Sequence, residues 1–253
     1  MATIHLAIEG LSAAGKSEVG KLLEMPMLVF RVNRGLPEGI RKVKFFKERV
    51  GDNPFLKGFY SGGMAEMSGF ASQMFFLHAR VMTSAHLQMW NGGIAIEDRS
   101  IFGDEIFAEN LKNQGKLRPE AFAEYKRHRT ELMKIYGVRE PDGIILLDIN
   151  LATCLKRLKE RETGETLEPG YWGPLVDLYA KKFKEIEARI PTVRIDANTD
   201  FLVDESYAMQ IADSTNSLIQ KILALRASIN NGKRGATETA GKAVRHPAVS
   251  LTE

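Results

Sequence analysis

The chain has 253 residues, 44% hydrophobic and 26% charged, so it is long enough to bury a full core as one domain of ordinary size. Its net charge of +3 at pH 7 is only mildly basic and does not require nucleic acid as a partner. The single cysteine, Cys154, excludes an intramolecular disulfide and is typical of a reducing compartment. We see no apolar run of the ~18 residues that a membrane span needs and no charged leader, so we expect a cytoplasmic protein without a membrane partner.

The predicted elements alternate between strands and helices along the chain. Short apolar, β-branched runs predict five strands, at residues 3–10, 43–48, 93–98, 143–149 and 192–197. Helical patterns fill the segments between them, at 16–24, 70–90, twice between the third and fourth strands, then at 151–162, 171–189 and 204–228. This alternation predicts an α/β fold, with a five-stranded parallel sheet flanked by helices on both faces.

The end of the chain differs in composition from the rest. Residues 229–253 are small and polar and lack periodicity, which is typical of a disordered tail. We therefore predict one domain over residues 1–228, followed by a C-terminal tail at 229–253.

The first strand leads into a phosphate-binding motif. Residues 10–17 read GLSAAGKS and match the pattern G-x-x-x-x-G-K-[ST] between a predicted strand and a predicted helix. In such a loop the backbone N–H groups and the helix N-terminus bind phosphate oxygens, the lysine binds the β- and γ-phosphates, and the serine hydroxyl ligates Mg²⁺. We expect ATP or another nucleoside triphosphate to bind here through Gly10, Ser12, Ala13, Ala14, Gly15, Lys16 and Ser17.

A second motif follows the third strand. The segment EDRSIFGDEIFA (97–108) begins where an open parallel sheet places its ligands, at the carboxyl end of a strand. It resembles the D/E-R-S signature of the deoxynucleoside kinases, which carry an aspartate four residues after the serine.

Further matches to that family occur in the same order along the chain, from Thr3 to about Leu225. They are FKERVGDNPF (46–55), SQMFFLHAR (72–80), RLKERETGE (157–165) and RIDANTDF (194–201), and they resemble bacterial deoxyadenosine and deoxyguanosine kinases. The resemblance implies a P-loop kinase fold with a short lid, ATP and Mg²⁺, a deoxynucleoside acceptor and a homodimer. It gives no reason to expect nucleic acid as a partner.

The resemblance implies a role for each charged residue near the acceptor. Glu48 is similar to the general base that takes the proton of the 5′-hydroxyl, and Arg99 to a residue that binds near that hydroxyl. Asp98 resembles a carboxylate that assists Mg²⁺ through water. From the residues alone, a surface glutamate in a charged run is the favoured reading of Glu48. Asp98-Arg99 can also be a plain salt bridge, and Glu97 is an alternative carboxylate, although the register favours Asp98.

Three residues resemble the family's base-binding set. Gln73 and Arg80 are seven apart, which puts them on one helix face, two turns apart. The resemblance implies that Arg80 pairs with Asp104 and orients it toward a base with an exocyclic amino group, so adenine, guanine or cytosine is favoured. A structural ion pair is the alternative use of Arg80. Tyr60 resembles the tyrosine that meets the sugar 3′-hydroxyl, and a core tyrosine is the alternative.

The predicted lid departs from the family pattern. Arg157 and Arg161 resemble arginines that stabilise the transferring phosphoryl group, the alternative being a solvated basic helix, but Thr163 stands where the family has another arginine. The acid that helps hold the sugar corresponds to Glu165, or to Glu168 after a register shift. After the fifth strand, the resemblance implies that the donor base contacts Asp196, Asn198 and Phe201.

A segment of about ten extra residues precedes Glu48, within 26–43, and we expect it beside the acceptor site. The leading hypothesis is an ATP-dependent 5′-phosphotransferase that converts a deoxynucleoside to its monophosphate in nucleotide salvage. One alternative is a nucleoside monophosphate kinase of the thymidylate type. Another is a non-catalytic relative, such as the accessory subunit of respiratory complex I that resembles this family.

Overall fold

The five predicted strands form one parallel sheet. The structure, a computed structural model, describes residues 3–61, 66–161, 165–199 and 204–242. Its strands are β1 (Ile4–Gly10), β2 (Val43–Phe46), β3 (Ile94–Asp98), β4 (Gly143–Asp148) and β5 (Thr192–Asp196). They pair in the order β2-β3-β1-β4-β5, which confirms the predicted five-stranded α/β fold.

The register aligns the carboxyl ends of the central strands. Ile8 in β1 lies opposite Asp98 in β3, and Gly10 lies opposite Leu147 in β4. The central strands are buried on both faces, which explains why their sequences read as nearly continuous apolar runs. Loops that leave β1, β2 and β3 therefore meet at one edge of the sheet.

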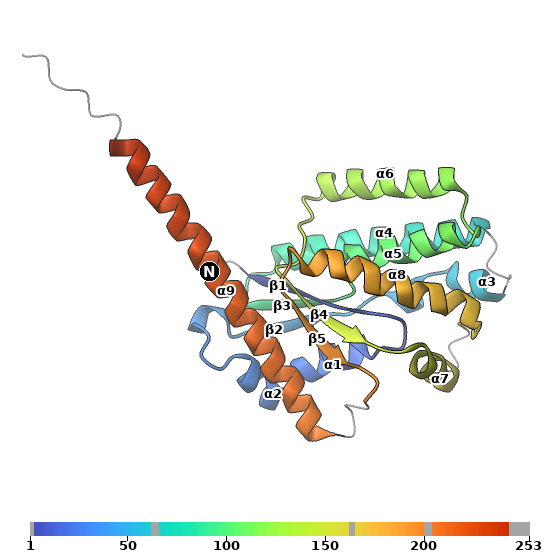
Figure 1. Cartoon of the computed structure of the whole chain (residues 1–253), viewed down its shortest axis with the longest axis horizontal. Coiled ribbons are helices and arrows are strands. Elements are labelled where there is room, and N and C mark those ends of the chain that lie inside the picture. Colours follow the sequence, from blue (N-terminus) through green and yellow to red (C-terminus); the bar gives the residue numbers. More distant parts are fainter. Residues whose placement is uncertain (1–2, 62–65, 162–164, 200–203, 243–253) are drawn as a thin grey trace, which may run out of the picture.

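Helices cover both faces of the sheet (Figure 1). One face carries α4 (Glu66–Met89), α5 (Ile101–Asn113) and α8 (Pro169–Glu187), and α6 (Pro119–Ile135) packs outside α4 and α5. The other face carries α1 (Lys16–Leu23) and α9 (Glu205–Lys242), with α2 (Pro26–Val32) packed on α9. Two further helices, α3 (Leu56–Ser61) and α7 (Leu151–Arg161), lie toward the carboxyl ends of the strands.

The segment before β2 is a correction to the sequence prediction. Residues expected as an insertion beside the acceptor site form α2 and the short 3₁₀ turn Glu38–Ile40, and they pack on α9. Asn216 of α9 donates to the carbonyl oxygens of Val32 at 2.7 Å and Arg34 at 2.9 Å. These hydrogen bonds satisfy the carbonyls at the end of α2 and hold it on the opposite face of the sheet from α4.

Other element boundaries also differ. Helix α3 was not predicted, and α8 begins at Pro169 rather than at 171, with its proline in the first helical turn. Helix α9 continues to Lys242, beyond the predicted end at 228, while residues 243–253 of the predicted tail lie outside the described residues. Within the part of the chain that the structure describes, every helix is too short or too polar to cross a bilayer.

Candidate active site

A cavity of about 720 Å³ opens at the carboxyl ends of β1, β2 and β3. This volume is in the range of small-ligand sites, roughly 300–1,000 Å³. Its walls come from the phosphate-binding loop, the segment after β2, and helices α3, α4, α5 and α8. The predicted residues among its lining are Ser12, Ala13, Gly15, Lys16, Ser17, Glu48, Tyr60, Gln73, Asp98, Arg99, Asp104, Arg161 and Glu165.

The phosphate-binding loop has the strained backbone that such a cradle requires. Gly15, which precedes the first turn of α1, has a φ of 91°, and Ala13 has a φ of 60°. A Cβ on Gly10 would lie 2.8 Å from the carbonyl oxygen of Leu147 in β4, so only glycine fits there. Ala14 is fully buried under this loop.

Lys16 is folded back onto the same loop. Its Nζ donates to the carbonyl oxygens of Gly10 at 3.2 Å and Leu11 at 2.8 Å. Burial and the nearby Arg99 charge lower the pKa of Lys16 to about 8, against the opposing effect of Asp98 and Glu48. A bound phosphate would favour the charged lysine and compete with these carbonyls for its protons.

Ser17 and Asp98 together form a fitting site for a divalent cation. The Ser17 hydroxyl donates to Asp98 Oδ2 at 2.6 Å, while Asp98 Oδ1 is buried without a hydrogen-bond partner among the described residues. Burial raises the pKa of Asp98, although Lys16 opposes this effect, so a nearby cation would stabilise its charged form. An oxygen-only pair of this kind suits Mg²⁺, which completes its shell with water and substrate phosphates.

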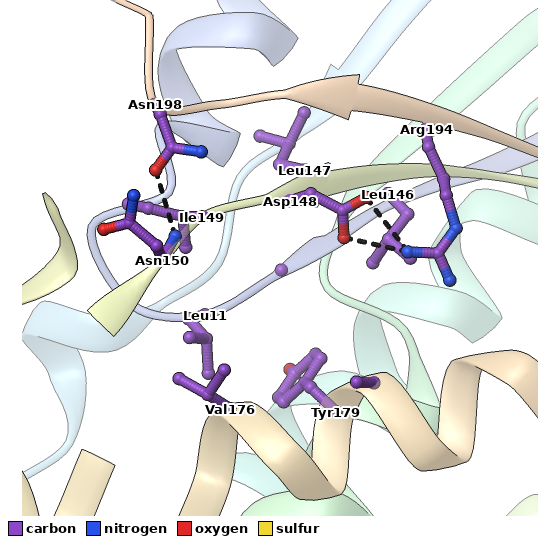
Figure 2. Close-up of a pocket in the computed structure, with 12 residues that line it drawn as sticks. Leu11, Leu146, Leu147, Asp148, Ile149, Asn150, Val176, Tyr179, Arg194 and Asn198 are labelled. Atoms are coloured by element: carbon purple, nitrogen blue, oxygen red, sulfur yellow. Dashed lines mark hydrogen bonds and ion pairs between the residues drawn. The ribbon is translucent and has the colours of Figure 1, made fainter. Parts of the chain in front are cut away.

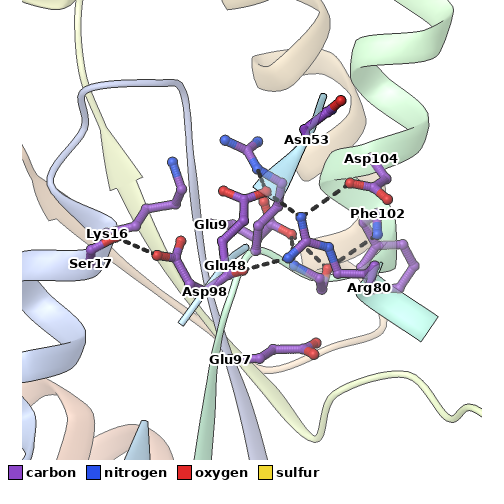
Figure 3. A network of polar contacts seen from close by, with 12 residues as sticks. Glu9, Lys16, Ser17, Glu48, Asn53, Arg80, Glu97, Asp98, Phe102 and Asp104 are labelled. Carbon is purple, nitrogen blue, oxygen red and sulfur yellow. Dashed lines mark hydrogen bonds and ion pairs between the residues drawn. The ribbon is translucent and has the colours of Figure 1, made fainter. Parts of the chain in front are cut away.

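Glu48 lies between two arginines (Figure 3). Its Oε1 is 2.5 Å from Arg80 Nη2 and 3.4 Å from Arg99 Nε. Burial disfavours the charge on Glu48, but Arg80, Arg99 and Lys16 outweigh it and lower its pKa to about 2. The carboxylate is therefore ionised throughout the neutral range.

Arg80 connects this carboxylate to Asp104, another member of the predicted base-binding set. Its Nη2 also donates to Asp104 Oδ1 at 3.2 Å, and its Nη1 donates to the backbone oxygen of Asp98 at 2.6 Å. Asp104 Oδ2 is buried and has no hydrogen-bond partner among the described residues. Gln73, two helical turns before Arg80 on α4, is 6% exposed and lines the same cavity. The predicted Arg80–Asp104 pair is thus present, and it includes Glu48 as a third member.

The opposite wall of the cavity carries two tyrosines. Tyr60 of α3 is hydrogen-bonded through its hydroxyl to Tyr171 of α8, and the two rings meet edge to face at 6.4 Å. Burial raises the pKa of both hydroxyls, and the nearby Glu165 charge adds to the effect. Both tyrosines therefore stay protonated and act only as neutral hydrogen-bonding groups.

The predicted lid arginines lie on α7, beside the phosphate-binding loop. Arg157 donates to the carbonyl oxygens of Ala13 at 3.4 Å and Thr199 at 3.3 Å, and Arg161 is 3.8 Å from Glu18. Thr163 lies outside the described residues.

Two of the predicted donor-base residues, Asp196 and Asn198, are not part of the lining of the large cavity. Asp196 accepts from the backbone N–H of Asn198 at 2.9 Å, and Asn198 lines a separate cavity of about 240 Å³ between β4 and α8 (Figure 2). Phe201 lies outside the described residues.

Comparison with known proteins identifies the family. The profile described as deoxynucleoside kinase matches residues 6–220. The chain belongs to the deoxynucleoside kinase family. It is accordingly an enzyme, a phosphotransferase with a nucleotide-binding P-loop fold, and the family resemblance seen in the sequence is confirmed.

Two relatives and one solved structure are similar to this kinase. It is 27% identical over 220 residues to deoxyadenosine kinase of Dictyostelium discoideum, covering 85% of this chain and 80% of that protein. It is 28% identical over 153 residues to deoxyguanosine kinase of the same organism, covering 58% and 52% of the two chains. The structure of deoxyadenosine kinase from M. mycoides with bound dCTP superposes with a TM-score of 0.64 at 24% identity, covering 84% of this kinase and 98% of that chain.

Sequence reasoning missed two buried residues that contact Arg99 or its neighbours in this kinase. Glu9, in β1, is fully buried and accepts hydrogen bonds from Ser100, and Tyr179, on α8, accepts one from Arg99. A charged residue inside the apolar run TIHLAIEG was a usable signal for Glu9, because a buried charge needs a partner. Tyr179 carried no such signal, since a tyrosine in an amphipathic helix is ordinarily a core residue.

Proposed function

We propose that this deoxynucleoside kinase transfers the γ-phosphoryl group of ATP to the 5′-hydroxyl of a deoxynucleoside, the first phosphorylation step of nucleotide salvage. The observation that carries the proposal is that one cavity holds both halves of such a reaction. Lys16 and Ser17 line it at the donor end, and Glu48, held by Arg80 and Arg99, lines it at the acceptor end.

At the donor end, the chain's own groups bind and orient the triphosphate. The N–H groups of the loop and the N-terminus of α1 bind phosphate oxygens, and Lys16 exchanges its carbonyl partners for the β- and γ-phosphates. Mg²⁺ held by Ser17 and Asp98 neutralises phosphate charge when bound. Arg157 and Arg161, on the helix beside the loop, supply further positive charge to the transferring group.

At the acceptor end, Glu48 hydrogen-bonds the 5′-hydroxyl and accepts its proton. Because its pKa is about 2, Glu48 is a weak base, and the proton moves to it late, once the oxygen has begun to bond to phosphorus. A loose transition state of this kind demands orientation of the hydroxyl more than strong proton abstraction. Arg99 lies near the same oxygen and stabilises the charge that develops on the phosphoryl group.

Base selection is assigned to Gln73, Arg80 and Asp104. Asp104 Oδ2 is buried and has no hydrogen-bond partner within the described part of the chain, which favours a base that presents an exocyclic N–H₂ donor. Adenine, guanine and cytosine carry such a group and thymine does not, so we place deoxyadenosine, deoxyguanosine and deoxycytidine ahead of thymidine. Tyr60 and Glu165 bind the sugar 3′-hydroxyl at the wall nearest α8.

The proposal extends to a homodimer formed through α4. Four residues, His78, Met82, His86 and Met89, follow one another at helical spacing on its exposed side. Met82 is 53% exposed and Met89 is 80% exposed, and apolar groups in such a row favour association.

Product identification by mass spectrometry tests the proposed reaction. The full chain is incubated with ATP and Mg²⁺ and each of the four deoxynucleosides, and in parallel with the corresponding monophosphates. We expect a deoxynucleoside 5′-monophosphate and ADP in equal amounts, formed fastest with amino-bearing bases and lost when EDTA removes Mg²⁺. A clear preference for a monophosphate acceptor would point to the thymidylate-type alternative. Absence of any phosphorylated product would favour a non-catalytic relative.

A further inference from the structure

Arg99 has an unusual backbone conformation for a residue of its type. It directly follows β3 and has a φ of 67°, in the left-handed region that residues other than glycine rarely adopt. Its N–H donates to the carbonyl oxygen of Ile8 at 2.9 Å, so the hydrogen bonding of the sheet holds the chain in this turn. A conformation that is held against its own preference frequently marks a functional position.

The guanidinium of Arg99 is contacted on several sides. Its Nε is 3.4 Å from Glu48, and its central carbon lies 4.6 Å from the centre of the Phe107 ring. Its Nη1 donates a short hydrogen bond to the Tyr179 hydroxyl. Glu48 and Phe107 line the large cavity together with Arg99, whereas Tyr179 lines the separate, smaller cavity (Figure 2). Tyr179 therefore contacts Arg99 without being part of the lining of the large cavity.

The Tyr179 hydroxyl also has an acceptor for its own proton. It donates to Glu9 Oε2 at 3.5 Å, so the direction of the hydrogen bonds runs from Arg99 to Tyr179 and on to Glu9. The Tyr179 ring is fixed by stacking on Phe183 at 5.5 Å and by an edge contact with Phe107 at 6.1 Å.

Glu9 joins this row of contacts to the segment that follows Arg99. Its Oε1 accepts from the Ser100 N–H at 2.7 Å and from the Ser100 hydroxyl at 2.6 Å, and Ser100 in turn caps α5. The tight packing leaves no room for a larger residue at Gly103, where a Cβ would lie 2.7 Å from both Arg99 Cγ and Glu9 Oε2. The carboxyl group thus lies next to Arg99. Burial raises the pKa of Glu9, and the Arg99 charge opposes this effect.

We propose that Tyr179 and Glu9 are positioning residues that fix the Arg99 guanidinium toward the transferring phosphoryl group. The inference rests on the proposed function, in which Arg99 acts near the 5′-hydroxyl. A charged group that is already oriented stabilises a transition state without paying for reorganisation at the moment of reaction. Without the Tyr179 hydroxyl, a buried N–H of Arg99 lacks its acceptor, and the guanidinium can turn toward Glu9 and away from the phosphoryl group.

Tyr179→Phe tests this inference because it removes one oxygen and retains the packing of the ring. We expect kcat to fall about tenfold, the size expected from one lost hydrogen bond to a charged group, with KM for the deoxynucleoside within about twofold of wild type. The control is Tyr136→Phe. Tyr136 lies at the C-terminal end of α6, is 45% exposed and lines neither of the two cavities, so its kcat should be unchanged.

A double-mutant cycle separates positioning from a general structural effect. If Tyr179 acts through Arg99, then Tyr179→Phe costs little in an Arg99→Lys background, where the bidentate group is already gone. Glu9→Gln provides a second route to the same residue. It retains the Ser100 contact and the volume while removing the charge, and should also lower kcat more than it alters KM. If circular dichroism shows that Tyr179→Phe is unfolded, the kinetics of Glu9→Gln test the positioning role instead.

The outcomes are distinct. Full kcat in folded Tyr179→Phe, or an equal loss in the wild-type and Arg99→Lys backgrounds, would overturn the positioning role while leaving the proposed function intact. If the wild-type chain phosphorylates no deoxynucleoside, the proposed function fails and the inference fails with it.

Discussion

At the scale of single residues, Glu48 illustrates how the site sets the charge of a group. Its carboxylate is 12% exposed and contacts two arginines, so its environment favours the ionised form despite burial. A carboxyl whose pKa is lower in the folded state than in the unfolded state stabilises the fold above its unfolded pKa. That contribution disappears as the pH falls through the folded pKa.

This linkage predicts a pH-dependent difference between wild type and Glu48→Gln. The folded pKa is about 2 against an ordinary value of 4.5, so the carboxylate contributes on the order of 3 kcal/mol above pH 4.5. The difference in unfolding free energy between the two proteins should shrink as the pH falls from 5 toward 2. Urea titrations at several pH values measure it. A difference that stays constant or grows on acidification would show that Glu48 is not held as an ion.

Asp104 leads to a prediction about specificity. Asp104→Asn retains the shape of the side chain, but its amide offers N–H₂ in place of one acceptor oxygen. We expect kcat/KM for deoxyadenosine to fall by about 10- to 100-fold, with a smaller loss for thymidine, since one bidentate base contact is worth roughly 1–3 kcal/mol. Competition between the two nucleosides measures the ratio directly. An unchanged ratio would remove Asp104 from base recognition.

Sequence reasoning reached the residues that carry motif signals and missed those that act through packing. Lys16 and Ser17 follow from spacing alone, and Arg80 and Asp104 from an ordered resemblance. Glu9 and Tyr179 come from β1 and α8, 170 positions apart, and their contact depends on how α8 crosses the sheet. Such a contact has no local pattern in the sequence.

At the scale of elements, the strands were predictable and the short helices were not. Each strand lies within two residues of its predicted bounds. The central strands β1, β3 and β4 are nearly continuous apolar runs because helices cover both of their faces, whereas the edge strands β2 and β5 carry exposed charged residues. Helices α2 and α3 have seven and six residues, too few to display a helical period, and each depends on tertiary contacts. Asn216 and the surface of α9 hold α2 in place through contacts that the sequence of α2 does not reveal.

The contact between α1 and β2 leads to a stability prediction. Gly20 of α1 faces Phe45 of β2, and a Cβ on Gly20 would lie 2.1 Å from the Phe45 ring. Gly20→Ala should therefore lower the unfolding free energy by about 1–3 kcal/mol, the usual effect of overpacking. The control is Gly58→Ala in α3, where nothing lies within 4 Å of the new Cβ, so that the protein is unchanged or slightly more stable. Thermal unfolding of the two variants measures the contrast, and equal melting temperatures would contradict the packing described.

At the scale of the whole molecule, the exposed side of α4 is the surface that we propose for the homodimer contact. Met82→Glu introduces a charge into the α4 row, and it should shift the proposed dimer to monomer in size-exclusion chromatography with light scattering. Met27→Glu on α2, where Met27 is 61% exposed, is the matched control and should leave the mass unchanged. A wild-type chain that is monomeric at all concentrations would contradict the proposed dimer.

The architecture brings the ends of three strands and residues of six helices, α1, α3, α4, α5, α7 and α8, to one cavity. Glu48 lies at the point where we propose that the donor and acceptor halves meet. We propose that this site transfers phosphate with Glu48 as the base. The most direct test is kcat of Glu48→Gln beside Glu38→Gln, a control whose side chain is 89% exposed. We predict a loss of about 10²–10⁴ in kcat for Glu48→Gln and none for Glu38→Gln, with both proteins folded. Full kcat in folded Glu48→Gln would contradict the account.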